Sequence, residues 1–136
     1  MEDNMKRVFT VGVYDVLHIG HVKLFERARN LGDHLTVAVQ DGDYVLKYKP
    51  DAKMVYSTDE RVYMVHSVRF VDEVVLYKDV DSIVKEVDFD IFAVGPDQQH
   101  PGFQAAMRWC RENGREVIVL PRTEGISSTK LREGIN

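Results

Sequence analysis

The sequence predicts an α/β fold in which a doubly wound, mainly parallel five-stranded sheet carries helices on both faces. Short apolar runs rich in Val, Ile and Phe alternate along the chain with segments of helical periodicity. The runs are nearly continuous in apolar character, which is typical of strands buried on both faces. A helix between two such strands provides the right-handed crossover that parallel neighbours require. The expected strands are Arg7–Val13, Leu35–Val39, Glu73–Tyr77, Ile91–Gly95 and Val117–Leu120.

The first two expected helices have recognisable ends. Apolar residues recur at three- and four-residue spacing after the first strand and stop at Gly32, a position typical of a C-terminal cap. Farther along, Ser57 and Glu60 have the spacing of a capping box, which predicts a helix that ends before Asp72. The apolar faces of these helices consist of Leu24, Phe25, Ala28 and Leu31 in the first and Val62, Val65 and Val68 in the second.

The second half of the chain contains further helical segments. Val80–Val87 is a short candidate, and Phe103–Asn113 carries an apolar stripe followed by Gly114. A last helix could begin at Ser127. Asp41–Ser57 is the longest stretch without clear periodicity, and a loop of this length in a small domain tends to be functional.

Composition limits the class of protein. The chain has 136 residues, 44% of them hydrophobic, so we expect one globular domain spanning residues 1–136. Its 18 basic and 22 acidic side chains argue against binding to nucleic acid. No apolar stretch reaches the length of a membrane span and no signal peptide is evident, so we expect a cytoplasmic protein without a membrane partner. Cys110 is the single cysteine, which excludes an internal disulfide and a cysteine-based zinc site.

The end of the first expected strand holds a pair of histidines. Ligands of open parallel sheets bind beyond the carboxyl ends of the strands, and here the chain reads Gly12-Val13-Tyr14-Asp15-Val16-Leu17-His18-Ile19-Gly20-His21. Helix N-terminal amides and imidazole N–H groups favour a phosphate, and Gly20 permits its close approach to the backbone. The pair would also suit zinc, but the other histidines show no partnering motif, so no metal ligand is assigned.

Three segments together resemble one family. The His18-Ile19-Gly20-His21 motif resembles the signature of the cytidylyltransferase-type nucleotidyltransferase superfamily, HxGH. Arg122-Thr123-Glu124-Gly125-Ile126-Ser127-Ser128-Thr129 resembles the C-terminal signature of bacterial glycerol-3-phosphate cytidylyltransferases, and Glu60-Arg61 with Arg69-Phe70-Val71-Asp72-Glu73-Val74 resembles their middle segment. The likeness spans roughly Arg7 to Leu131 and implies a Rossmann-like nucleotidyltransferase domain, commonly a homodimer.

The resemblance implies transfer of CMP from CTP to a small alcohol phosphate, with sn-glycerol 3-phosphate as the leading acceptor. The product, CDP-glycerol, would feed the synthesis of a teichoic-acid-like or capsular polymer. The attacking phosphate is already ionised at pH 7, so catalysis needs alignment and charge stabilisation, with Mg²⁺ on the triphosphate. Alternatives are a cytidylyltransferase for another polyol or amino-alcohol phosphate, an adenylyltransferase, and a nucleotide-binding regulator without turnover.

The site residues are predicted from the motifs and from the resemblance. The resemblance is the only basis for Arg69, Arg122, Thr123 and Gly95. The lysine that binds phosphate in this family has three candidates here, Lys47, Lys49 and Lys53, and Lys49 is preferred. The predicted catalytic residues are His18, His21, Lys49 and Arg122. The predicted nucleotide contacts are Gly12, Val13, Tyr14, Gly20, Gly95, Thr123, Ser127, Ser128 and Thr129. The predicted acceptor contacts are Asp15, Lys47, Arg69 and Asp97.

The chain departs from the family pattern at two places. Val13 stands where a small hydroxyl residue is common, so one possible hydroxyl contact is missing. Gly95-Pro96-Asp97-Gln98-Gln99-His100 stands where the glycerol-phosphate enzymes have a sequence similar to Gly-Asp-Asp-Trp. Asp97 aligns with the second acid of that motif. Pro96 and the missing tryptophan alter a loop expected to face the nucleotide or the acceptor.

Overall fold

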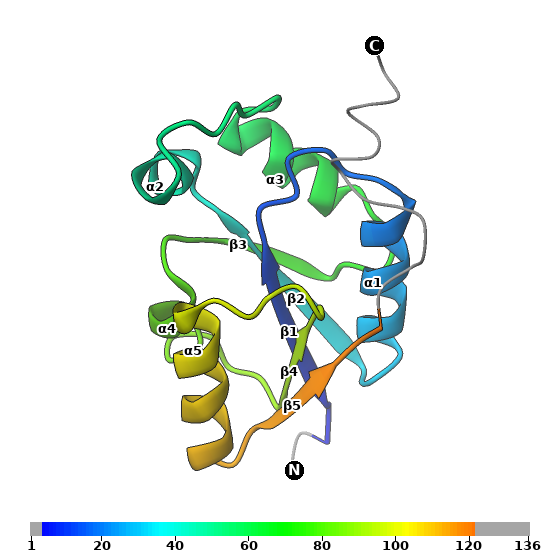
Figure 1. Ribbon diagram of the computed structural model, residues 1–136. Coiled ribbons are helices and arrows are strands. Elements are labelled where there is room, and N and C mark those ends of the chain that lie inside the picture. The colour runs from blue at the N-terminus through cyan, green and yellow to red at the C-terminus, as the bar shows by residue number, and fades with distance from the viewer. Residues whose placement is uncertain (1–3, 122–136) are drawn as a thin grey trace.

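A computed structural model describes residues 4–121 and confirms the predicted fold class. The sheet has five parallel strands in the order β3-β2-β1-β4-β5 (Figure 1). Chain order reverses between β1 and β4, and this switch point is where open α/β sheets bind ligands. The strands are β1 (Arg7–Gly12), β2 (His34–Gln40), β3 (Glu73–Tyr77), β4 (Ile91–Val94) and β5 (Glu116–Val119).

Burial differs between the central and the edge strands. The middle residues of β1 and β2 and all of β4 are buried, as their continuous apolar runs predict. The edge strands β3 and β5 are only partly buried, so the expectation of burial on both faces is wrong for them. Leu76 and Val119, for example, are about half exposed, because each edge strand has a neighbour on one side only.

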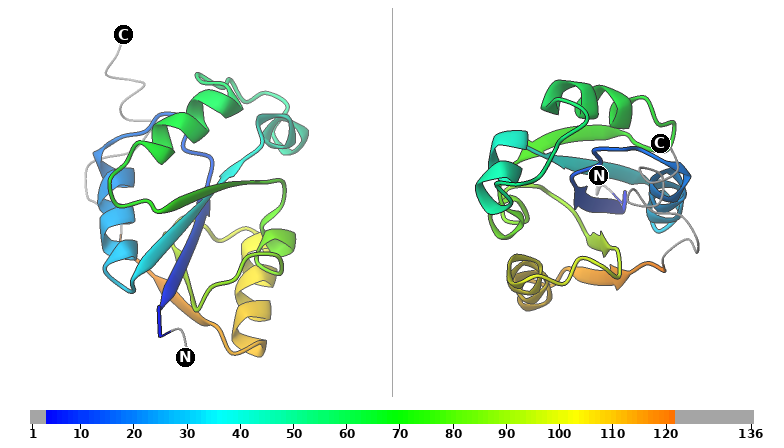
Figure 2. Two further views of the ribbon diagram at one scale, coloured as in Figure 1. Left: turned by 180° about the vertical axis from the view of Figure 1, so that it is seen from behind. Right: turned by 45° about the horizontal axis from the view of Figure 1, so that its top comes forward.

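The helices cover both faces of the sheet (Figure 2). Helices α1 and α3 contribute Phe25, Ala28 and Val65 to one core layer, and α4 and α5 contribute Ile83 and Met107 among others to the opposite layer. The helices are α1 (Ile19–Arg29), α2 (Gly42–Tyr48), α3 (Thr58–His66), α4 (Val80–Ile83) and α5 (Pro101–Glu112). Within the described residues, no helix is both long and apolar enough to cross a membrane.

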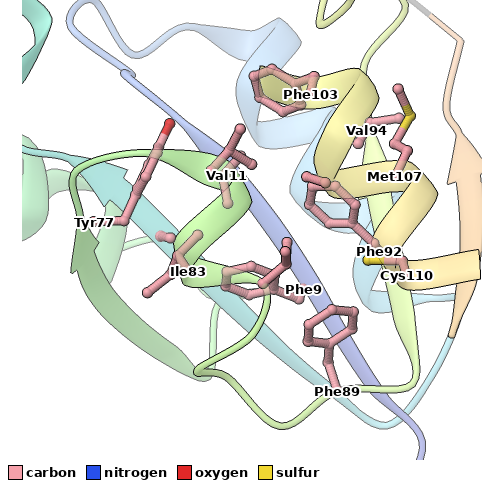
Figure 3. Close-up of a cluster of buried hydrophobic side chains, with 14 residues drawn as sticks. Phe9, Val11, Tyr77, Ile83, Phe89, Phe92, Val94, Phe103, Met107 and Cys110 are labelled. Atoms are coloured by element: carbon pink, nitrogen blue, oxygen red, sulfur yellow. The ribbon is translucent and has the colours of Figure 1, made fainter. Parts of the chain in front are cut away.

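Aromatic rings fill the layer beneath α4 and α5 (Figure 3). Phe9 of β1 stacks on Phe89 and on Phe92 of β4, with ring centroids 5.1 and 5.9 Å apart. Phe103 of α5 stacks on Phe92 at 6.5 Å. Cys110 is buried in the same layer, and burial raises the pKa of its thiol to about 11. This dense packing holds β1 and β4 side by side at the switch point.

Helix ends agree with most of the expected signals. Ser57 and Glu60 form the predicted capping box at the start of α3. Gly114 follows α5 with a φ of 74°, the left-handed conformation expected after a helix end. The first helix ends earlier than expected, because Asn30 is its C-terminal cap and not Gly32.

The expectation that Asp41–Ser57 is an irregular loop is wrong in its first half, which forms α2. The Asp41 side chain caps this helix by accepting from the Asp43 N–H at 3.0 Å. Val45 is the only described residue of α2 that is buried, so two helical turns present no apolar periodicity to detect.

Candidate active site

The turn after β1 is shaped by a close contact between Gly12 and Tyr14. Tyr14 has a φ of 54°, in the left-handed region, and its ring folds back over Gly12. A Cβ atom at Gly12 would lie 2.6 Å from Cζ of Tyr14, so only glycine fits. The Tyr14 ring is buried and makes edge contacts with His21 and Phe25. Its side chain therefore orients the histidine motif. The nucleotide contact of Tyr14 stays a prediction.

His18 and His21 together cap the N-terminus of α1. Nδ1 of His18 accepts from the Gly20 N–H at 3.0 Å, and Nδ1 of His21 accepts from the His18 N–H at 3.3 Å. An acceptor nitrogen carries no proton, so each neutral ring holds its proton on Nε2. The cap thus fixes the tautomer of both rings and leaves two Nε2–H donors at the positive end of a helix.

The environment keeps both imidazoles neutral. Their rings stack, with centroids 3.9 Å apart. Burial lowers the pKa of His18, and burial together with the neighbouring His18 lowers the pKa of His21 to about 4. At pH 7 both side chains are therefore neutral hydrogen-bond donors, which suits contact with phosphate oxygens without exchange of a proton.

Stability of the fold should depend on the protonation of His21. The unfolded chain binds this proton near pH 6.5 and the folded chain only near pH 4. The free energy of unfolding therefore decreases as the pH falls between these values. The loss from His21 is at most about 3 kcal/mol. We expect urea unfolding at pH 7 and 4.5 to show a smaller decrease in His21→Asn, whose Oδ1 can still accept from the His18 N–H. Equal decreases in both proteins would contradict the shifted pKa.

Asp15 ties the histidine turn to the segment before α3. It is buried, and its carboxylate accepts from the Val55 N–H at 2.9 Å and from the Tyr56 N–H at 2.9 Å. The sequence prediction gave Asp15 a contact with the acceptor. In the structure its oxygens hold the end of the 41–57 segment, which also carries the candidate lysines.

Replacing Asp15 should loosen this segment. Asn keeps one acceptor oxygen but turns an NH₂ group towards a backbone N–H, so we expect Asp15→Asn to lower the free energy of unfolding by about 1–3 kcal/mol. Hydrogen exchange of the Val55 and Tyr56 amides should accelerate before the core unfolds. Asp51→Asn, at an exposed position of the same segment, is the matched control. Unchanged exchange at both amides would show that Asp15 does not hold the segment.

The buried side chain of Arg61 connects the carboxyl ends of β1 and β2. Its side chain is fully buried, and Nη1 donates to the carbonyl oxygens of Val13 at 2.9 Å and Gln40 at 2.8 Å. Nη2 donates to Oγ1 of Thr58 at 3.1 Å. Burial lowers the pKa of the guanidinium, and the charge of nearby Asp15 opposes that shift. Arg61 therefore fixes the ends of β1 and β2 relative to α3.

Sequence reasoning did not assign a role to Arg61. The resemblance includes it, yet only as part of the middle segment. A usable signal was present, since Arg61 lies four residues before Val65 and hence on the apolar face of the helix. A charged residue on such a face needs buried partners.

The candidate lysines lie on and after α2, and all three are exposed. Lys47 is in the last turn of α2, with Nζ 5.4 Å from the centre of the Tyr44 ring. Lys49 is the C-terminal cap of α2, and Lys53 follows in the irregular part of the segment. The structure leaves the choice among them open, and the assignment of Lys49 remains a prediction.

The loop after β4 faces the histidine turn across the switch point. Gly95 has both of its backbone polar groups bonded to Gln98, so its predicted nucleotide contact competes with these bonds. Asp97 is exposed in the following turn. These two predicted site residues lie beyond β4, next to the turn that follows β1.

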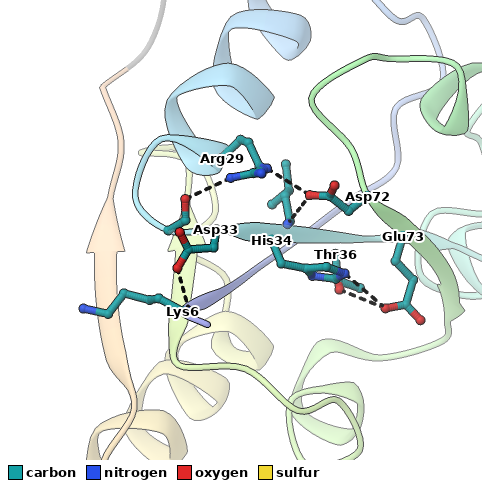
Figure 4. Close-up of polar contacts among 9 residues, drawn as sticks. Lys6, Arg29, Asp33, His34, Thr36, Asp72 and Glu73 are labelled. Atoms are coloured by element: carbon teal, nitrogen blue, oxygen red, sulfur yellow. Dashed lines mark hydrogen bonds and ion pairs between the residues drawn. The ribbon is translucent and has the colours of Figure 1, made fainter. Parts of the chain in front are cut away.

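Arg69 lies at the other end of the sheet. It follows α3 and precedes β3, three residues before Asp72, whose carboxylate pairs with Arg29 of α1 at 3.0 Å and accepts from the Leu35 N–H (Figure 4). Arg29 and His18 are at opposite ends of α1, about 16 Å apart at 1.5 Å per residue. Within one chain, the structure does not bring Arg69 to the histidine pair.

The C-terminal signature falls outside the described residues. Arg122, Thr123, Ser127, Ser128 and Thr129 are among the residues that the structure does not describe, so their predicted roles stay predictions. The chain leading to them is anchored, since the Leu120 N–H donates to the Val94 carbonyl at 2.8 Å and Arg27 donates to the Pro121 carbonyl at 3.2 Å. Residues 4–121 contain no group of three His, Cys, Asp or Glu side chains suited to a metal ion.

Comparisons with known proteins agree with this geometry. The model of the cytidylyltransferase-like family matches residues 9–134. Glycerol-3-phosphate cytidylyltransferase of Bacillus subtilis is 38% identical over 96% of this chain and 98% of its own length. The enzyme of the same name from Staphylococcus aureus is 40% identical over 95% of this chain and 94% of its own. A solved structure of a lipopolysaccharide core biosynthesis protein from Thermoplasma volcanium superposes with a TM-score of 0.70 and 26% identity, covering 88% of this chain and 97% of that one.

Proposed function

The chain belongs to the cytidylyltransferase-like family of nucleotidyltransferases, and on this premise we propose that it transfers CMP from CTP to sn-glycerol 3-phosphate. The products are CDP-glycerol and pyrophosphate. The observation that carries the proposal is the neutral histidine pair, whose two Nε2–H donors lie at the N-terminus of α1 beyond the carboxyl end of β1. The choice of acceptor is supported by relatives that are similar over nearly the whole chain.

The reaction requires little proton transfer by groups of the protein. An oxygen of the glycerol phosphate attacks the α-phosphorus of CTP, a new P–O bond forms, and the bond to the bridging oxygen of the β-phosphate breaks. Pyrophosphate leaves with the electron pair. His18 and His21 donate their Nε2–H groups to phosphate oxygens and keep their protons throughout. Because the attacking oxygen is ionised, no residue acts as a general base.

Further positive charge must balance the two anionic substrates. A triphosphate and a phosphomonoester together bring roughly five to six negative charges, more than one helix terminus can offset. We propose that MgCTP is the nucleotide substrate and that Lys49 and Arg122 contact phosphates, with Lys47 and Lys53 as alternatives to Lys49. We also propose that the enzyme is a cytoplasmic homodimer. The homodimer rests on the resemblance, and the location rests on the composition of the chain and its single cysteine.

Substrate choice can be tested with a matrix of nucleotides and acceptors. Pyrophosphate release would be measured with Mg²⁺ for CTP, ATP, GTP and UTP, each combined with sn-glycerol 3-phosphate, phosphocholine, phosphoethanolamine or a sugar phosphate. We expect turnover only with CTP and sn-glycerol 3-phosphate. Turnover of CTP with a different acceptor would reassign the substrate, turnover with ATP would indicate an adenylyltransferase, and CTP binding without turnover would indicate a regulator.

A further inference from the structure

Gln98 occupies an unusual place at the switch point. In the register of the sheet, β1 pairs with β4 at Val8 with Ile91 and at Phe9 with Phe92. Both strands continue beyond the last pair, β1 to Gly12 and β4 to Val94. The ladder between the two central strands therefore stops short of their carboxyl ends, which is the part of the sheet where ligands of this fold bind.

The side chain of Gln98 bridges the two strands beyond the end of the ladder. Its Oε1 accepts from the Gly95 N–H at 2.9 Å, and its Nε2 donates to the Val11 carbonyl at 2.8 Å. A primary amide offers the same donor and acceptor as a peptide group. Gln98 thus takes the place of a missing backbone link between β1 and β4.

The backbone of Gln98 also closes the turn that presents Asp97. The Gln98 N–H donates to the Gly95 carbonyl at 3.2 Å, with Pro96 and Asp97 at the two central turn positions. Proline fixes φ at the first central position, as in type I and type II turns. The turn is thereby held at both ends, and exposed Asp97 lies at its tip.

We infer that Gln98 is a positioning residue for the acceptor: it holds the 95–98 turn so that the Asp97 carboxylate can accept hydrogen bonds from the hydroxyl groups of a polyol phosphate. The inference rests on the proposed function. A carboxylate repels the phosphate end of the acceptor and accepts from its hydroxyl end, so its placement favours acceptors that carry hydroxyls. A tryptophan at this position could not replace Gln98, because an indole has one donor and no acceptor.

Acceptor discrimination tests this inference. The readout is the ratio of kcat/KM for sn-glycerol 3-phosphate to that for n-propyl phosphate, which lacks the hydroxyls. Gln98→Met keeps the length of the side chain but loses both bonds, and we expect this ratio to fall about tenfold, mainly through the KM of glycerol 3-phosphate. Gln98→Glu keeps the acceptor for the Gly95 N–H, so its ratio should fall less.

Gln104→Met is the matched control, because Gln104 is exposed on α5 and its side chain donates to Gln99, outside the 95–98 turn. Its ratio should equal that of the wild type. Thermal unfolding of each variant would verify the fold. If Gln98→Met lowers kcat/KM equally for both acceptors, or changes neither, the positioning role is wrong although the proposed function stands. Wild-type protein that turns over neither acceptor with CTP would overturn the proposed function and this inference with it.

Discussion

Replacing His18 by asparagine should lower kcat/KM for CMP transfer by about 10²–10³ while leaving the protein folded. The Asn Oδ1 can take the place of Nδ1 and accept from the Gly20 N–H, so the cap of α1 is retained. The side chain is too short to present a donor where Nε2–H lies in the histidine. Steady-state kinetics at pH 7.5 with saturating MgCTP and glycerol 3-phosphate would measure the loss.

His18→Ala separates the two roles of this residue. Alanine removes both the cap and the donor. We expect the His18→Ala variant to be as inactive as His18→Asn, and its free energy of unfolding to be lower by about 1 kcal/mol. If His18→Asn retains wild-type activity while His18→Ala does not, the contribution of His18 is to cap the helix. The assignment of Nε2–H as a phosphate donor would then be wrong.

Replacing Arg61 by methionine should cause the largest loss of stability among these substitutions, about 3–5 kcal/mol in the free energy of unfolding. The change leaves the carbonyl oxygens of Val13 and Gln40 without their donor and removes the positive charge beside buried Asp15. Urea unfolding at pH 7 would measure the loss. Arg61→Lys keeps the charge without the planar fork, so an intermediate loss is expected.

Arg108 provides the control for this substitution. It is exposed on α5, and Arg108→Met should change the free energy of unfolding by less than about 0.5 kcal/mol. The activity of Arg61→Met, measured at a temperature where it is folded, should also fall, because the ends of β1 and β2 support the histidine turn and α2. A loss no larger than that of Arg108→Met would contradict the bracing role of Arg61.

The fold could be predicted closely because its signals are local and redundant. Strand β3 spans the same residues as the apolar run that predicted it, and the capping box at Ser57 marks the start of α3. Helix α2 escaped prediction because its two turns bury one residue and are stabilised by an Asp41 cap and a Tyr44–Tyr48 contact. The range of such a short helix is decided by tertiary contacts rather than by periodicity.

The candidate site was predictable in its residue types but not in its arrangement. Spacing led to the prediction that His18 and His21 donate to phosphate, whereas their mutual capping and the resulting tautomers depend on atomic geometry. Position along the sequence could not show that Arg69 and His18 lie near opposite ends of the sheet. The bridging role of Gln98 can be recognised only from the register of β1 and β4, which a pattern in one sequence does not give.

The central claim is that an oxygen of the acceptor phosphate attacks the α-phosphorus of CTP and that pyrophosphate is the leaving group. The most direct measurement is ³¹P NMR and mass spectrometry of a reaction with MgCTP and glycerol 3-phosphate labelled with ¹⁸O in its phosphate group. We expect all of the label in CDP-glycerol, including its bridging oxygen, and none in pyrophosphate. Pyrophosphate that carries ¹⁸O, or free CMP formed in place of CDP-glycerol, would contradict the account.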